Sequence, residues 1–353
     1  GLVTATDVTQ VTGLAADLET LADNEGTSGN AVDLATNVAI VVSNGTTTAA
    51  QLNLLDTKTS ANVNASAVTA ISGNASDLNT LVGNEGAGAD KVNLKSDVAI
   101  TLSSAEATTE TILTALMDAT TGNVDAQAIT KITGTRAKLT TLIGLEGTGG
   151  DEIDLDADFK ATITDTTTTA ALLNTFNGIV PDLVDATSVT ALSGTSAELD
   201  TLIGTEGTSG NAVDLAADVA ITVNNGTTTA AELNTITAKT SANVTATAVA
   251  AISGTATQLN TLAGNEGTGA GEIDLAATVA VTVSAGTTTA AQLNTINGLS
   301  TANITATAVT AISGTASLLN TIVGLEGTGN NEINLKSDVA ITLSSAEATT
   351  ETI

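Results

Sequence analysis

The sequence contains no Cys, His, Trp or Tyr, and it has only one Pro (Pro181), one Met (Met117) and two Phe (Phe159 and Phe176). Without His or Cys, the chain cannot hold a Ser–His catalytic triad, a Cys nucleophile or a zinc site of the usual kind. The absence of Cys also excludes disulfides. A core built from Ala, Val, Leu and Ile must be thin and closely stacked, because no large side chain can fill a wide gap.

Positive charge is also scarce. Nine Lys and Arg residues face 38 Asp and Glu residues, which gives a formal net charge of −29. Such a surface repels nucleic acid and anionic membranes, and no apolar run approaches the ~18 residues of a membrane helix. We therefore expect no nucleic-acid partner and no membrane insertion. A Lys-poor acidic surface stays soluble at high ionic strength, which favours a salty exterior such as sea water.

A repeat dominates what is present. The segment Ala251–Gly264 recurs along the chain, and so does a related segment that begins at Gly286. The central Leu residues of the first segment are spaced 60 or 61 residues apart: Leu18, Leu78, Leu139, Leu199, Leu259 and Leu319. Those of the second segment have the same spacing: Leu52, Leu113, Leu173, Leu233 and Leu293. Because the two segments alternate, each repeat of about 60 residues consists of two unequal copies of one smaller unit.

A longer period is superimposed on this one. Residues 93–112 recur letter for letter at 334–353, an offset of four repeats. The chain also begins and ends inside its pattern, without an initiator Met or a signal peptide at its start, so we expect it to be a piece of a longer protein. Our repeat boundaries within a single continuous fragment, 1–353, are 13–72, 73–133, 134–193, 194–253, 254–313 and a partial 314–353.

Local chemistry predicts strands and short helices. Residues 219–223 alternate apolar and polar side chains, which is typical of a half-buried strand. Thr229 and Glu232 have the spacing of a capping box, and Leu233 and Ile236 form an apolar stripe on a helix of about two turns. Thr195 and Glu198 repeat the box in the sister unit. Helices this short need a surface to pack on.

These elements predict a repeat solenoid whose strand-rich coils carry two-turn helices, an α/β solenoid, with an all-β solenoid as the alternative. Stacked strands lie about 4.8 Å apart, whereas packed helices need about 8–10 Å. We therefore expect the helices of the two unequal units to lie on opposite sides of the stack, where each row would have room.

Acidic residues recur at fixed positions. Each helix predicted for the first repeated segment, the one exemplified by Ala251–Gly264, is followed by Glu-Gly in a Gly-rich turn. An Asp or Asn follows seven or eight residues after that Glu. Ca²⁺ binds carboxylates and carbonyls in such loops. The candidate calcium ligands are Glu25, Asp33, Glu85, Glu146, Asp154, Glu206, Asp214, Glu266, Asp274 and Glu326. The alternative, which we favour because the loops lack the dense Asp spacing of known calcium loops, is that these side chains cap local amides.

The segment Ala311–Thr321, together with the acidic, Cys-free composition, resembles the giant Thr/Ala/Gly-rich repeat proteins of bacterial cell surfaces. The most similar are those of marine cyanobacteria, including the surface protein needed for swimming. This resemblance implies a secreted surface or filament protein. A second, local resemblance, carried by Thr48–Asp56, is to phage tail-fibre repeats, although Gln51 and Thr57 depart from that pattern.

We therefore expect a non-enzymatic, extracellular structural protein that forms a rod or filament at a cell surface: a surface layer, sheath, adhesin stalk or motility fibre. It would associate with itself end to end or laterally, and surface glycans are a further candidate partner. No cofactor is required. The alternatives are a calcium-stiffened adhesin and a segment of a phage tail fibre.

Overall fold

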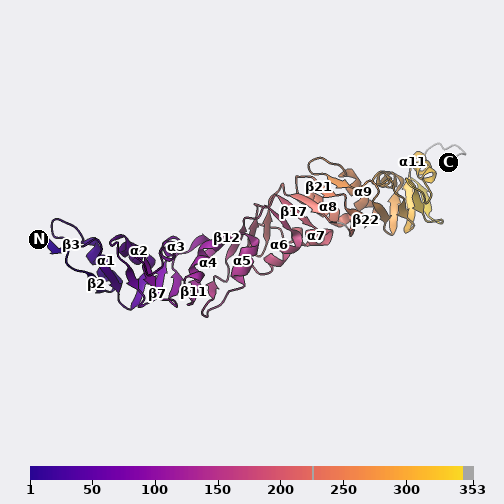
Figure 1. Ribbon diagram of the computed structural model, residues 1–353. Coiled ribbons are helices and arrows are strands. Elements are labelled where there is room, and N and C mark those ends of the chain that lie inside the picture. Colours follow the sequence, from indigo (N-terminus) through magenta and orange to yellow (C-terminus); the bar gives the residue numbers. More distant parts are fainter. Residues whose placement is uncertain (225, 345–353) are drawn as a thin grey trace. The chain divides into compact units, whose positions relative to one another are not determined.

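The computed structural model describes residues 1–224 and 226–344, and its chain divides into two compact units. Unit 1 comprises residues 1–164 and 179–184, and unit 2 comprises residues 165–178 and those from 185 onward. Within each unit the repeats follow one another without interruption (Figure 1). A single solenoid across the whole chain stays a prediction.

Among the described residues, each coil as far as α11 carries one short helix. The described residues contain five helices in unit 1: α1 (Ala15–Asp23), α2 (Ala49–Thr57), α3 (Ala75–Gly83), α4 (Glu110–Asp118) and α5 (Arg136–Ile143). They contain six in unit 2: α6 (Ala170–Asn177), α7 (Ser196–Gly204), α8 (Ala230–Lys239), α9 (Ala256–Gly264), α10 (Ala290–Asn297) and α11 (Ala316–Gly324). None of the described helices is long and apolar enough to cross a membrane.

The strands of unit 1 pair in parallel. The paired groups are β1 (Val3–Ala5) with β3 (Val32–Leu34); β2 (Gln10–Gly13), β4 (Ala39–Val42), β6 (Val63–Ala65) and β8 (Val92–Leu94); β5 (Gly45–Thr48), β7 (Val68–Gly73), β9 (Ala99–Leu102), β11 (Val124–Ala126) and β13 (Ile153–Leu155); and β10 (Glu106–Thr109), β12 (Ile129–Gly134) and β14 (Lys160–Ile163).

Unit 2 repeats this arrangement. Its paired groups are β15 (Thr167–Thr169), β17 (Ala191–Gly194), β19 (Ala220–Val223), β21 (Val244–Ala246) and β23 (Ile273–Leu275); β20 (Gly226–Thr229), β22 (Val249–Gly254), β24 (Ala280–Val283), β26 (Ile304–Ala306) and β28 (Ile333–Leu335); and β25 (Gly286–Thr289), β27 (Val309–Gly314) and β29 (Ala340–Leu343). The remaining described strands are β16 (Val184–Ala186) and β18 (Val213–Leu215). The predicted α/β solenoid is confirmed.

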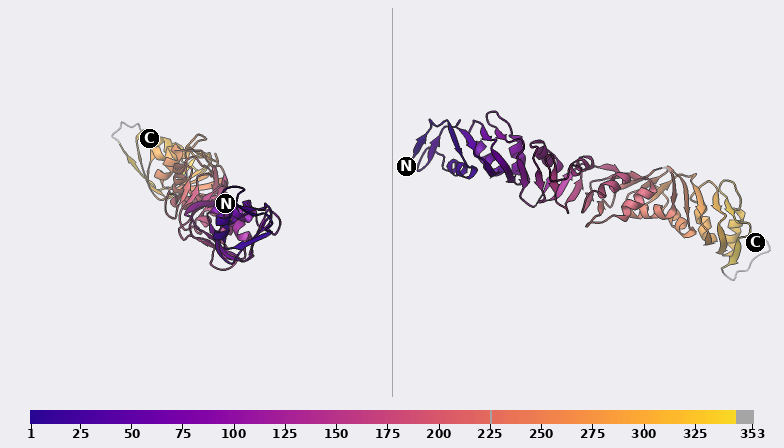
Figure 2. Two further views of the ribbon diagram at one scale, coloured as in Figure 1. Left: turned by 90° about the vertical axis from the view of Figure 1, so that its left-hand side faces the viewer. Right: turned by 90° about the horizontal axis from the view of Figure 1, so that it is seen from below.

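The helices form one row in each unit, so the prediction that they alternate between opposite sides is wrong. Helix α2 packs between α1 and α3, and in unit 2 helix α8 packs between α7 and α9. Figure 2 shows the coils of each unit following one another in chain order. The stack must therefore give the helices more room than the spacing of its strands alone provides.

The inclination of the strand ladders supplies this room. In unit 2, Ile221 pairs with Val244, and Val244 pairs with Ile273. The counterpart of Ile221 one repeat later is Val281, which lies eight residues beyond Ile273 and belongs to another sheet. After two steps of strand pairing, the ladder is therefore displaced by eight residues toward the start of the coil, so it runs obliquely to the stack. Coils can then be spaced further apart along the stack than the ~4.8 Å that separates paired strands.

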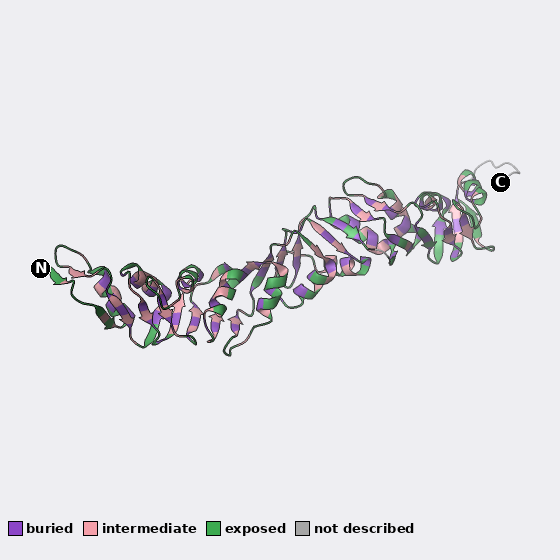
Figure 3. Cartoon of the chain, viewed as in Figure 1, coloured by how far each residue is buried: buried purple, intermediate pink, exposed green. Residues whose placement is uncertain are grey.

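The core lies between the row of helices and the inner faces of the strands (Figure 3). All eleven repeat-defining Leu residues are buried, from Leu18 to Leu319. Both predicted capping boxes are confirmed: Thr195 caps α7 with Glu198, and Thr229 caps α8 with Glu232.

Small residues allow a close approach at the starts of α8 and α10. A Cβ atom added at Gly254 would lie 2.9 Å from the Cβ of Ala230, and one at Gly314 would lie 2.9 Å from that of Ala290. Such contacts leave no room for a methyl group. The Gly that precedes one helix and the Ala that begins the previous helix are therefore one packing unit, which explains part of the Ala/Gly-rich composition.

Candidate functional site

The Glu-Gly turns form closed loops, which we call the Glu-Gly loops: residues 24–32, 84–92, 145–153, 205–213, 265–273 and 325–333. In the loop 265–273, the amide of Ile273 donates to the carbonyl of Asn265 and the amide of Gly267 donates to the carbonyl of Ile273, each at 2.9 Å. The other five loops have the same two hydrogen bonds. The backbone alone therefore closes each loop.

The structure separates the two kinds of predicted calcium ligand. The Glu residues are all exposed, and their backbones form isolated bridges to the first residue of the following strand: Glu25, Glu85, Glu146, Glu206, Glu266 and Glu326. The Asp residues are half-buried on short strands: Asp33 on β3, Asp154 on β13, Asp214 on β18 and Asp274 on β23.

Several of these side chains have partners other than a metal. Asp154 accepts a hydrogen bond from Gln127 at 2.8 Å, and Glu206 pairs with Lys239 at 2.7 Å. Over residues 1–224 and 226–344, no three or more acidic side chains gather as ligands of one metal ion would. The calcium row stays a prediction that this geometry does not favour.

Two of the predicted ligands do share a hollow. Glu146 and Asp154 line a depression of about 650 Å³ in unit 1, together with Asp156 and the apolar side chains of Phe159 and Pro181. Asp156 caps the local backbone there, since its Oδ1 accepts the amide of Asp158 at 2.7 Å. Asp156 is not one of the predicted calcium ligands, so the capping alternative for those residues stays a prediction.

An Asn side chain from the preceding coil fills the centre of four Glu-Gly loops. The Nδ2 of Asn243 lies 3.1 Å from the carbonyl oxygens of Gly267, Gly269 and Glu272. The same three contacts recur for three other residues: Asn62, Asn123 and Asn303. We call this arrangement the Asn clamp. It places an amide donor among carbonyl oxygens that converge as they would around a cation.

A Glu side chain completes three of the clamped loops. Oε2 of Glu272 accepts the amide of Gly269 at 2.7 Å, and the same bond joins Glu152 to Gly149 and Glu332 to Gly329 at 2.6 Å. A Cβ atom added at Gly269 would lie 2.8 Å from the Glu272 carboxylate, so a larger residue there would displace this Glu side chain. The loop is thus held from outside by Asn and from within by Glu.

Sequence reasoning missed the clamp, although a signal exists. Each clamping Asn lies 24 residues before the Gly of its Glu-Gly loop. Where that position is Leu2 or Leu183, the loop instead reads Gly-Thr-Ser-Gly-Asn-Ala-Val and lacks the capping Glu. The loop sequence therefore varies with a residue of another coil, and this pattern could have shown that the two touch.

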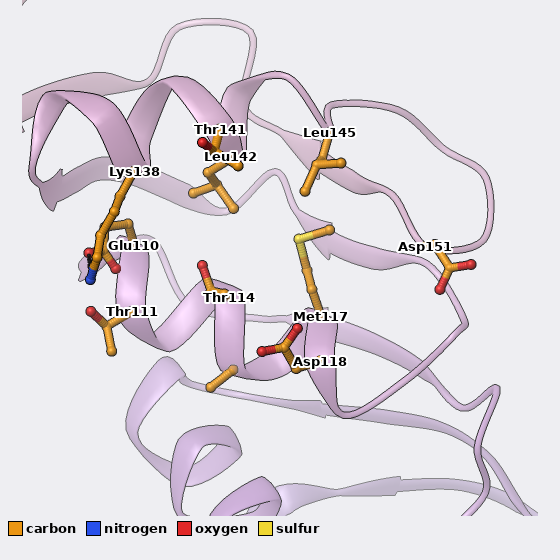
Figure 4. A pocket seen from close by; sticks show the side chains of 11 residues that line it. Glu110, Thr111, Thr114, Met117, Asp118, Lys138, Thr141, Leu142, Leu145 and Asp151 are labelled. Carbon is orange, nitrogen blue, oxygen red and sulfur yellow. Dashed lines mark ion pairs between the residues drawn. The ribbon is translucent and has the colours of Figure 1, made fainter.

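A second feature is a groove of about 600 Å³ between α4 and α5 (Figure 4). Helix α4 contributes Glu110, Thr114 and Met117, and α5 contributes Lys138 and Leu142. Figure 4 shows the Glu110–Lys138 pair at one end, Asp151 at the other, and Asp118 beside Met117 between them. The sequence analysis did not anticipate this site.

The groove lies beside a helix, α4, that lacks a tie found on α2, α6 and α8. Asn53 on α2 donates to the carbonyl of Asp77 on α3 at 2.9 Å, and Asn234 on α8 donates to the carbonyl of Gln258 on α9, also at 2.9 Å. Asn174 on α6 reaches Glu198 in the same way. Thr114 occupies this position on α4 and is too short to reach the next helix.

Glu110 adds a wedge at the start of α4, where α2, α6, α8 and α10 all have Ala. Its carboxylate is buried and pairs with Lys138 at 2.8 Å. Burial alone would raise the pKa of Glu110, but the hydrogen bonds from Lys138 and Thr111 and the charge of Lys138 hold it below its usual range. This end of the groove therefore carries a charged but balanced pair.

No protein-family model, curated protein or solved structure matches the chain. The resemblances to bacterial surface repeats and to phage tail fibres therefore stay predictions.

Proposed function

We propose that the protein is a non-enzymatic, extracellular structural repeat protein whose coils extend a rod or filament at a cell surface. The proposal is supported by an architecture in which each coil depends on its neighbours. A net charge of −29 and the lack of His and Cys suit an inert, solvated surface better than a catalytic one.

One observation carries the proposal. Ile100 and Leu102 on β9 are 1% and 2% exposed, and Ile100 stands in register with Val124 of the next coil. Ile341 and Leu343, at the same positions in the last described coil, are 54% and 53% exposed. The apolar face of a coil is therefore covered by the coil that follows it. Each added coil lengthens the stack and makes the same buried contacts as the one before it.

Electron microscopy of two chains tests the rod. The first is the 353-residue chain, and the second carries a tandem duplication of residues 194–253. We expect the second particle to be longer by one repeat at unchanged width. A particle that widens, or whose length stays constant, would contradict the proposal.

Localisation needs a separate test. An antibody against the chain should label intact source cells without permeabilisation, and protease added to those cells should remove the label. Labelling that requires permeabilised cells would contradict a surface role. Labelling of virus particles alone would favour the tail-fibre alternative instead.

A further inference from the structure

The groove between α4 and α5 has the size of a ligand site. Its volume of about 600 Å³ lies within the range of small-molecule pockets. It lies wholly within unit 1. Two side chains that line it differ from their counterparts on α2, α6, α8 and α10: Glu110 stands in place of Ala and Thr114 in place of Asn.

The groove is apolar along its length. Met117, Leu142 and Leu145 face one another across it, and Leu145 is 43% exposed (Figure 4). Met adapts its shape to a ligand more readily than a branched residue does. Threonine hydroxyls at Thr114 and Thr141 border this strip, so the walls accept an aliphatic chain and also offer hydrogen bonds.

Charge distinguishes the two ends. At one end, Glu110 and Lys138 balance each other at 2.8 Å. From the middle of the groove to the other end, Asp118 and Asp151 are exposed and form no ion pair with any residue of the described part of the chain. The groove therefore has an excess of two negative charges, and this excess is at the end near Met117 and Leu145.

We propose that this groove binds a small aliphatic ammonium compound. The carboxylates of Asp118 and Asp151 attract its cationic group, and its unbranched chain lies along Met117, Leu142 and Leu145. An aliphatic carboxylate is disfavoured by the same two carboxylates, and an uncharged alcohol gains only the apolar contact.

The segment that supplies Glu110 occurs more than once in the sequence. The segment 93–112, which supplies Glu110, recurs at 334–353, where Glu351 is its counterpart. Residues 345–353 lie outside the described part of the chain. An identical copy four repeats away makes this sequence a recurring variant of the repeat rather than an isolated substitution.

Calorimetric titration of the whole chain at low salt with three probes of equal chain length tests the proposal. The probes are octylammonium, octanoate and 1-octanol. We expect octylammonium to bind with one site and at least about fivefold more tightly than the other two. Equal affinity for all three, or tighter binding of octanoate, would overturn the proposal. Tighter binding of a Lys-containing tetrapeptide than of octylammonium would overturn its assignment to a small amine.

Two variants locate the site. Thr114→Asn restores the tie seen in α2 and α8, closes the groove and should abolish binding without changing the charge. The control Thr235→Asn, on an exposed face of α8, should bind as the parent does. Unchanged binding by Thr114→Asn would overturn the proposal.

The charge contribution has its own matched pair. The double variant Asp118→Asn/Asp151→Asn should bind octylammonium at least about fivefold more weakly and 1-octanol equally well. Asn is tolerated at position 151, because Asn331 adopts the same positive φ. The control Asp158→Asn/Asp218→Asn changes the net charge equally at exposed sites outside the groove. If both double variants weaken octylammonium binding equally, only the net charge matters and the site is not the groove.

Discussion

The Nδ2 atom of Asn243 lies 3.1 Å from the carbonyl oxygen of Glu272, a residue 29 positions further along the chain. The same nitrogen contacts Gly267 and Gly269, so one amide group fixes a whole loop of the next coil. The contact joins consecutive coils through a side chain, in addition to the backbone ladder.

Replacing Asn243 with Ala should destabilise unit 2. The half-buried hydrogen bond to Gly267 and the exposed one to Gly269 would be lost, while the carbonyl of Glu272 keeps the amide of Val244, so we expect a cost of about 1–2 kcal/mol. Urea unfolding measures the loss, and hydrogen exchange should show faster exchange at Gly267 and Ile273. Asn211→Ala, in a loop without the clamp, is the control and should stay within about 0.5 kcal/mol of the parent. Unchanged exchange in the Asn243 variant would show that the backbone bonds alone hold the loop.

Calcium is expected to leave the thermal unfolding temperature unchanged. The carbonyl oxygens that converge in each clamped loop already accept from an Asn amide, and the neighbouring Glu side chains are dispersed. Calorimetry with millimolar Ca²⁺ and with EDTA tests this expectation. A rise of several degrees in Ca²⁺, reversed by EDTA, would instead support the calcium row predicted from the sequence.

Gly314→Ala should cost about 1–3 kcal/mol, because the new methyl group would meet Ala290 at 2.9 Å in a packed interior. Gly324→Ala is the matched control: nothing lies within 4 Å of its added Cβ, and it ends helix α11. We expect that control to be neutral or to stabilise by up to about 1 kcal/mol, since Ala favours helices over Gly. Equal losses in both variants would show that the Gly–Ala contact does not set the helix position.

Acid should weaken the cap of helix α8. Burial alone would raise the pKa of Glu232, but hydrogen bonds from Thr229, Thr228 and Ser196 hold it below its usual range. A carboxyl whose pKa is lower in the folded state contributes stability above its unfolded pKa, and loses it as the pH falls through the folded pKa. Glu232→Gln, which places here the residue found at Gln292, should therefore flatten the loss of stability between about pH 5 and 3. If the variant lost as much stability as the parent on acidification, this assignment would be contradicted.

Asp56 should have the opposite pH dependence. Burial and the nearby Asp90 raise its pKa, and they outweigh the hydrogen bond from Asn84 and the charge of Lys91. A carboxyl whose pKa is raised in the folded state costs stability once the pH rises through that pKa. Asp56→Asn should accordingly raise the urea midpoint at pH 7 and leave it unchanged at pH 3. A lower midpoint at pH 7 would show that the Asp56 charge is favourable in the fold.

The sequence predicts the parts of this fold that depend on local spacing. The repeat-defining Leu residues, the capping boxes at Thr195 and Thr229 and the strand near Ile221 all follow from neighbours within a few residues. Helix placement was predicted wrongly, because it depends on the register between coils. The pairing of Ile221 with Val244 sets that register, and no local pattern encodes it.

The candidate sites show the same limit. The spacing of Glu and Asp residues drew attention to the loops, but the decisive side chain in the loop 265–273 is Asn243, which belongs to the previous coil. The groove beside α4 likewise involves two helices, and the tie found on α2 and α8 is absent there. An absent contact has no signature in a single helix, so it appears only when α4 is compared with α2 and α8 in three dimensions.

The inclined ladders have a consequence for how the stack resists being taken apart. Neighbouring strands of one coil belong to different sheets: β11 pairs with β9 and β13, whereas β12 pairs with β10 and β14. Separating that coil from its neighbours must break hydrogen bonds in two sheets at once. Both sheets extend to the coils on either side of the break. Neither boundary of this coil is therefore also a boundary between sheets, so the stack has no preferred plane of separation there.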